Sequence, residues 1–197
     1  MCIMKYFERG ETMISYEGKE PFIFVSYAHR DATRVLPIIT ALSENGFRIW
    51  YDAGIEAGAE WPEYIAKHLE GAKTFIAFLS SNAVDSINCR QEINYAITLG
   101  KPTLFIHLDA IELSSGLKMR LGLSQAMFLY QYATLKSFLD ELTKTQILSP
   151  CKKNELVNCE FDDTELYNFD DNFPEIEKEK LPYGEIELLG ITLHSPD

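Results

Sequence analysis

The chain has 197 residues, of which 46% are apolar and 12% aromatic, and its formal net charge is −12. This composition excludes a disordered chain and favours one domain of about 130–150 residues with extensions. The charge is uneven, because residues 150–197 hold 13 acidic and 4 basic residues. No basic patch offsets repulsion from phosphates, so nucleic acid is a poor candidate partner.

Targeting signals and cysteine spacing point to a cytoplasmic protein. No apolar run reaches the roughly 18–20 residues that cross a membrane, and the N-terminus lacks the apolar region of a secretory signal. The four cysteines have no CxxC spacing, which argues against a zinc site and for a reducing compartment. They are Cys2, Cys89, Cys151 and Cys159.

The chain then reads as strands alternating with helices. In order, the first half is expected to hold a strand at 21–25, a helix from about Arg34 to Asn45, a strand at 47–51, a loop at 52–59 and a helix at 60–70. The first strand is a continuous apolar run, as in strands buried on both faces. Pro37 is tolerated only near a helix start, so the first helix is expected to begin at Arg34 or later.

The second half continues this alternation. The expected elements are a strand at 74–79, a loop from Ser80, a helix at about 86–99, a strand at 103–108, a poorly defined segment near 113–121, a strand at 125–130 and a helix at 135–142. Strands joined by helical crossovers predict a five-stranded parallel sheet with helices on both faces. This α/β domain spans 21–145, between extensions at 1–20 and 146–197. The acidic tail is interpreted as a charged, partly ordered appendage, or alternatively as a docking element through its apolar run at 184–194.

Residues 86–97 determine where Glu92 points. If they form a helix, an apolar stripe contains Cys89, Ile93, Ala96 and Ile97. At about 100° per residue, Glu92 lies at the edge of this stripe, roughly 85° from its centre. One side of its carboxyl is then shielded and the other is open to a ligand. Asn88 and Tyr95 share its side of the helix and are expected to frame a small cleft.

The remaining candidate residues follow the first three strands. In an open parallel sheet, ligands bind where the carboxyl ends of the strands meet. The loops at this edge supply an aromatic ring, a guanidinium, carboxylates and other polar groups, from Ser26, Tyr27, His29, Arg30, Asp52, Glu56, Trp61 and Asn88. Such side chains stack on flat rings, grip phosphates and bind hydroxyls.

Other site chemistries find little support. The chain has no GxGxxG, no GxxxxGK[ST] and no GxSxG motif, so a nucleotide-binding glycine loop and a serine nucleophile elbow are not expected. The four histidines lie on separate elements and lack metal-ligand spacing, so no metal site is expected. Ser80 is interpreted as a helix N-cap and Cys89 as part of the core.

Five segments in this order resemble a TIR (Toll/interleukin-1 receptor) domain of the bacterial type. They are residues 22–31, 46–52, 54–61, 75–86 and 88–93. The resemblance covers 21–145 and implies a flavodoxin-like fold. It also implies cleavage of the nicotinamide–ribose bond of NAD⁺ by Glu92, with NAD⁺ as the substrate and no cofactor.

The resemblance assigns roles to further residues. Tyr27, Ala28, His29 and Arg30 would lie against the nucleotide, and Glu56, Gly58 and Trp61 would belong to the family's BB loop. Many active members carry a tryptophan four residues before the glutamate, where this chain has Asn88. That change removes a stacking surface but leaves the carboxylate.

Two functional hypotheses follow. The first is an NAD⁺ glycohydrolase or ADP-ribose cyclase that self-associates and produces a nucleotide signal for a downstream effector, in antiphage defence of the Thoeris kind. The second is a non-catalytic scaffold, or a bacterial effector that mimics host TIR adaptors. A phosphoacceptor receiver domain shares the architecture, but Ser80 stands where its aspartate would end the third strand.

Overall fold

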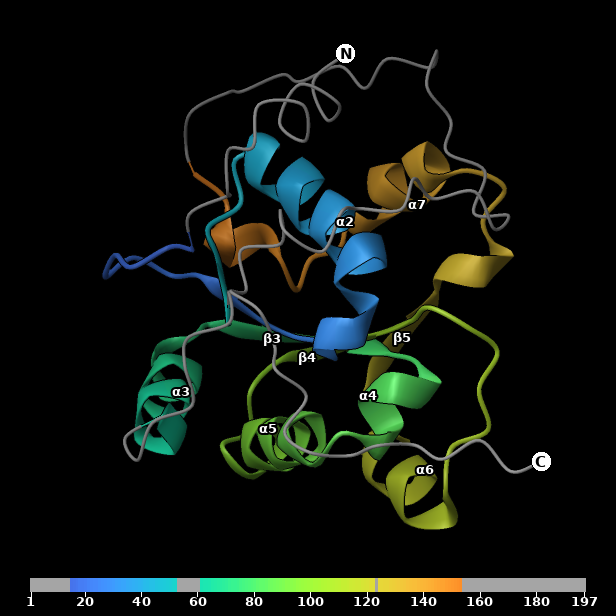
Figure 1. Cartoon of the computed structure of the whole chain (residues 1–197). Coiled ribbons are helices and arrows are strands. Elements are labelled where there is room, and N and C mark those ends of the chain that lie inside the picture. Colours follow the sequence, from blue (N-terminus) through green and yellow to red (C-terminus); the bar gives the residue numbers. More distant parts are fainter. Residues whose placement is uncertain (1–14, 53–60, 123, 154–197) are drawn as a thin grey trace, which may run out of the picture.

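A computed structural model describes residues 15–52, 61–122 and 124–153 (Figure 1). Five parallel strands form one sheet in the order β2-β1-β3-β4-β5. They are β1 (Ile23–Ser26), β2 (Ile49–Tyr51), β3 (Thr74–Leu79), β4 (Thr103–His107) and β5 (Gln125–Phe128). The strand order reverses next to β1, so a crevice is expected at the carboxyl ends of β1 and β3.

Helices cover both faces of the sheet, which confirms the predicted flavodoxin-like α/β fold. They are α2 (Ala32–Glu44), α3 (Trp61–Gly71), α4 (Ser81–Asp85), α5 (Ile87–Thr98), α6 (Ser115–Leu121) and α7 (Leu135–Leu142). In Figure 1, α2 and α7 lie on one side of the sheet, whereas α3, α5 and α6 lie on the other. Each face therefore buries its own layer of side chains.

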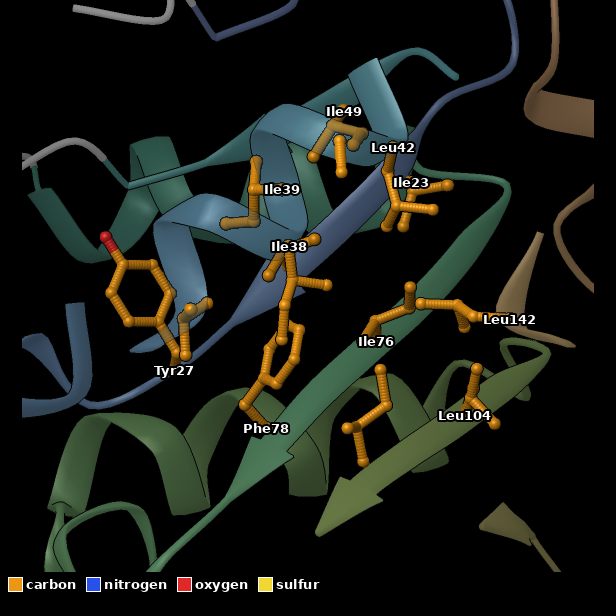
Figure 2. Packing of buried hydrophobic residues seen from close by; sticks show 14 of the residues in the cluster. Ile23, Tyr27, Ile38, Ile39, Leu42, Ile49, Ile76, Phe78, Leu104 and Leu142 are labelled. Atoms are coloured by element: carbon orange, nitrogen blue, oxygen red, sulfur yellow. The ribbon is translucent and has the colours of Figure 1, made fainter. Parts of the chain in front are cut away.

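Successive residues of the strands enter opposite cores. On β1, Ile23 and Val25 belong to the cluster under α2 and α7, whereas Phe24 belongs to the cluster under α3 and α5. Figure 2 shows the first cluster, in which Ile38 and Ile39 of α2 pack over the sheet. Because both faces of β1 and β3 are buried, these two strands need apolar residues at nearly every position, which is why they are nearly continuous apolar runs.

Several element boundaries differ from expectation. Helix α2 begins at Ala32, two residues before Arg34, and holds Pro37 inside it. Pro37 has no amide to donate to the carbonyl of Thr33. Thr33 is only half-buried, so water can replace that bond. The second strand is shorter than expected because Phe47 forms an isolated antiparallel bridge with Lys152.

Two helices were not predicted from the sequence. Ser80 does cap a helix, but that helix is the short α4, and its hydroxyl accepts a hydrogen bond from the amide of Ala83 at 3.1 Å. The poorly defined segment near 113–121 is helix α6, capped by Ser114. Strand β5 ends at Phe128, two residues early, because a short 3-10 helix follows it.

Three predicted features lie outside the described residues: most of the 52–59 loop, the first part of the N-terminal extension, and the acidic tail with its apolar run at 184–194. The domain limits at 21 and 145 and the cytoplasmic location stay predictions. Within the described ranges, no helix combines the length and apolarity that a membrane crossing needs.

Candidate functional site

A cavity of about 400 Å³ opens at the carboxyl end of β1, beside α4 and the first turns of α5. It brings together eight of the predicted site residues: Ser26, Tyr27, Ala28, His29, Arg30, Asp52, Asn88 and Glu92. It also contains four polar or sulfur-bearing residues that the sequence did not single out for the site: Asn82, Asp85, Ser86 and Cys89. The crevice expected from the strand order is therefore present and lined mainly by polar side chains.

Glu92 lies at the inner wall of this cavity. Its helix buries Cys89, Ile93 and Ala96, whereas Glu92 itself is half-buried at the edge of that face, as the helical spacing predicts. The Ser26 hydroxyl at the end of β1 donates a hydrogen bond to Oε2 of Glu92 at 2.5 Å. This contact links α5 to β1 and fixes the direction of the carboxyl group.

The electrostatic surroundings of Glu92 place its titration near neutrality. Burial raises the pKa of its carboxyl from 4.5 to about 7, and the negative charge of Asp52 adds to this effect. The hydrogen bond from Ser26 and the charge of His29 act in the opposite direction. Loss of water around a carboxylate favours the neutral acid, and here this outweighs the groups that stabilise the anion.

Charged groups from two loops face the cavity. Nε2 of His29 lies 3.5 Å from Oδ2 of Asp52, at side-chain exposures of 44% and 13%. Arg30 is exposed and also lines the cavity. The cavity thus combines a guanidinium and an imidazole suited to phosphates with carboxylates suited to sugar hydroxyls.

A buried carboxylate supports the cavity from behind. Asp31 is only 3% exposed and accepts hydrogen bonds from Oγ of Ser80 at 2.5 Å and from Nδ2 of Asn82 at 2.7 Å. These bonds tie the loop after β1 to α4 and fix Asn82 at the cavity wall. In the sequence, the polar residues Ser80 and Asn82 after β3 could have suggested a contact at this edge of the sheet. Their partner Asp31 could not have been identified from the sequence.

Some predicted site residues have other surroundings. The ring of Tyr27 is largely buried in the core, 6.5 Å between centroids from Tyr51, and Tyr27 also lines the cavity. Trp61 is the first residue of α3, whereas Glu56 and Gly58 lie outside the described residues. Cys89 packs with Ala28 and Ala83, in agreement with its core assignment, while it also lines the cavity.

The described part of the chain contains no cluster of three or more His, Cys, Asp or Glu side chains arranged to hold a metal ion. The residues that line the cavity offer the half-buried carboxyl of Glu92, the hydroxyl of Ser26 and the flanking side chains of His29, Arg30 and Asp52. A carboxylate so placed stabilises a developing positive charge on a bound ligand.

Comparison with known proteins identifies what the chain is similar to. Residues 23–134 match the family described as TIR domain. Among solved structures, the TIR domain of a Toll-related receptor from Hydra magnipapillata has a TM-score of 0.51 at 14% identity, covering 61% of this chain and 93% of that one. At this identity the likeness concerns the fold alone. No curated protein sequence matches.

Two bacterial enzymes of nucleotide and nucleoside chemistry are more distant structural neighbours. A CMP N-glycosidase from Clostridium botulinum has a TM-score of 0.43 at 19% identity, covering 60% of this chain and 97% of that one. A 2-deoxyribosyltransferase from Bacillus psychrosaccharolyticus has a TM-score of 0.45 at 14% identity, covering 68% and 99%.

Proposed function

The chain belongs to the TIR domain family, and we propose that it is an enzyme that cleaves the nicotinamide–ribose bond of NAD⁺. The observation that carries this proposal is the Glu92 carboxyl, half-buried in a polar cavity and held by Ser26. The cavity also offers His29 and Arg30 to the diphosphate, and Asp52 to sugar hydroxyls.

The reaction needs few catalytic groups besides this carboxylate. Nicotinamide is a cation while bound to the ribose, so it leaves without a general acid. The C1′–N bond breaks heterolytically, its electron pair stays on the pyridine nitrogen, and neutral nicotinamide departs. The ionised form of Glu92 stabilises the positive charge that then develops on the ribosyl carbon.

The second step decides the product. Water forms the new bond to C1′ and passes a proton to Glu92, which gives ADP-ribose. Attack by the adenine base or by a ribose hydroxyl instead gives a cyclic ADP-ribose isomer. We propose that this product is a signal for a downstream effector, in antiphage defence of the Thoeris kind, and that the protein works in the cytoplasm.

The test compares wild type with Glu92→Gln, incubated with NAD⁺ and assayed for released nicotinamide, with the second product identified by mass spectrometry. We expect Glu92→Gln to lose at least about 100-fold in rate, since a single preorganised charge-stabilising group is typically worth that much. The matched control is Glu112→Gln, because Glu112 is 93% exposed and its ion partner Lys118 lies outside the cavity.

Equal release by wild type and Glu92→Gln contradicts the proposal, as does no release by wild type at any protein concentration. Equal release would mean that cleavage does not depend on Glu92, whereas no release favours the alternative, a non-catalytic scaffold for other TIR domains. That alternative predicts partner capture in a pull-down with purified TIR domains that survives Glu92→Gln.

A further inference from the structure

Asn82 of α4 lines the cavity, and its side chain is anchored at one end only. Nδ2 of its amide donates a hydrogen bond to Oδ1 of Asp31 at 2.7 Å. Among the residues that the structure describes, none donates a hydrogen bond to the other end of this amide, the carbonyl oxygen Oδ1. The half-buried side chain of Asn82 therefore holds an acceptor that no described residue uses.

The direction of the bond between Asn82 and Asp31 follows from which groups carry hydrogens. Oγ of Ser80 accepts the amide hydrogen of Ala83 and gives its own hydrogen to Oδ2 of Asp31. Asp31 is the N-cap residue of α2, where the helix dipole favours the negative charge of a carboxylate. An ionised carboxylate only accepts hydrogen bonds, so Asp31 binds the NH₂ group of Asn82 and not its oxygen.

Burial keeps the amide of Asn82 in this one orientation. A rotated amide would bring its oxygen against Oδ1 of Asp31 and leave that carboxylate oxygen without a donor. Asp31 is only 3% exposed, so water does not replace the lost donor, and the rotated state is disfavoured. Asp31 itself does not line the cavity. The end of the amide that is turned away from Asp31, the oxygen, is thus the end left for a ligand.

The α4 side of the cavity consequently offers hydrogen-bond acceptors. Asp85, which is exposed and also lines the cavity, adds a carboxylate about one turn after Asn82. Phosphate oxygens are acceptors as well, so they suit this wall poorly and suit His29 and Arg30 on the loop after β1 better. Groups that donate hydrogen bonds, such as sugar hydroxyls and the amino group of adenine, match the α4 wall.

On the basis of the proposed function, we propose that Asn82 is a specificity-determining residue whose oxygen accepts a hydrogen bond from the adenosine half of NAD⁺. The donor is the adenine amino group or a hydroxyl of the adenosine ribose, because the reacting ribose stands at Glu92. Asp31 is the positioning residue that holds the amide in its accepting orientation. A site built around one such acceptor discriminates against ligands that lack the matching donor, since the acceptor then stays unpaired.

The test is a double-mutant cycle that combines a variant protein with a modified ligand. ADP-ribose is compared by ligand-observed NMR titration with inosine diphosphate ribose, which lacks the amino group, and with the 2′-deoxyadenosine and 3′-deoxyadenosine forms, which each lack one hydroxyl. The proteins are wild type, Asn82→Ala, Asp31→Asn and the control Ser81→Ala, whose side chain is exposed and outside the cavity. Thermal melts establish that each variant is folded.

We expect at least one analogue to bind wild type about five- to tenfold more weakly than ADP-ribose, as the loss of one hydrogen bond predicts. Which analogue this is identifies the donor. Asn82→Ala should bind that analogue and ADP-ribose equally, and Asp31→Asn should discriminate between them less than wild type does. Ser81→Ala should match wild type. A merely structural Asn82 would weaken both ligands alike and leave the ratio of their affinities unchanged.

The proposal is refuted if wild type does not bind ADP-ribose, if it binds all four ligands equally, or if Asn82→Ala keeps the preference of wild type. The first two comparisons use wild type alone, so they decide the matter even where a variant does not fold. NAD⁺ cleavage by wild type is measured in parallel. Cleavage without the expected discrimination refutes the role of Asn82 alone, whereas discrimination without cleavage refutes the enzymatic function and supports Asn82 as a ligand-binding residue.

Discussion

At neutral pH the Glu92 carboxyl is divided between its charged and neutral forms, because burial raises its pKa to about 7. Only the anion stabilises a developing ribosyl cation, so kcat/KM for NAD⁺ should rise with pH through about 7. Below that value we expect it to fall about tenfold per pH unit. A pH–rate profile from pH 5 to 9 measures this limb. A flat profile over that range would contradict the role of Glu92.

Ser26 should determine the pH at which kcat/KM rises, the ascending limb of the pH–rate profile. Its hydroxyl donates to Glu92 and thereby lowers the pKa of the carboxyl. In Ser26→Ala the limb should therefore move to higher pH, and activity should recover as the solution becomes alkaline. Ser81→Ala is the matched control, since Ser81 is exposed and does not line the cavity. A uniform loss of rate without a displaced limb would assign Ser26 a purely structural role.

The charged form of the Glu92 carboxyl should lower the stability of the folded protein at alkaline pH. Its pKa in the folded state, about 7, exceeds the ordinary value of 4.5. The stability associated with its neutral form is therefore complete below about pH 4.5 and is lost as the pH rises through 7. Glu92→Gln keeps the shape of the side chain without the charge. Its free energy of unfolding at pH 8 should therefore be about 1–3 kcal/mol higher than that of wild type.

Urea unfolding at pH 8 and pH 5 measures this difference. At pH 5 the folded wild type already holds a neutral Glu92, so the advantage of Glu92→Gln should shrink. A variant that is less stable than wild type at pH 8, or an advantage equal at both pH values, would show that the carboxyl is not destabilised by its burial.

At the scale of elements, the short helix α4 depends on contacts made far along the chain. Five residues supply little helical stability of their own, and Asp31 holds α4 through Ser80 and Asn82. We expect Asp31→Ala to lower the free energy of unfolding by about 2–4 kcal/mol, because two hydrogen bonds to a buried charged group are lost. Asn82→Ala should cost about 1–2 kcal/mol, since the Ser80 bond remains.

A double-mutant cycle, measured by urea unfolding, separates the contributions of Asp31 and Asn82 to the free energy of unfolding. If Asp31 acts through Asn82, Asn82→Ala should cost clearly less in the Asp31→Ala background than in wild type. Additive effects would mean that the two side chains stabilise the fold independently.

Comparison of the elements shows what the sequence can predict. Strands β1 and β3 are buried on both faces, so their continuous apolar runs identify them. The edge position of Glu92 follows from the spacing of Cys89 and Ile93 alone. Helix α4 is too short to display a period, and α2 begins at Ala32 although Pro37 then lies inside it. The contact between Asp31 and Asn82 joins residues 51 positions apart, a pairing that no local pattern encodes.

At the scale of the whole molecule, we predict that specific activity depends on protein concentration. TIR domains commonly self-associate, and in this chain His29, Arg30 and Asn88 are exposed while they line the cavity. A neighbouring copy placed over this opening would shield the substrate from water and strengthen the electrostatic effect of Glu92. Association is opposed by the net charge of −12, so salt should favour it by screening the repulsion between copies.

We expect nicotinamide release per protein molecule to rise over a roughly 100-fold range of protein concentration and then to level off as association saturates. Added salt should move the rise to lower protein concentration. Sedimentation of the same samples tests whether activity follows the associated fraction, with Glu92→Gln expected to associate like wild type while remaining inactive. A specific activity that is constant across the whole range would show that a single copy holds the complete site.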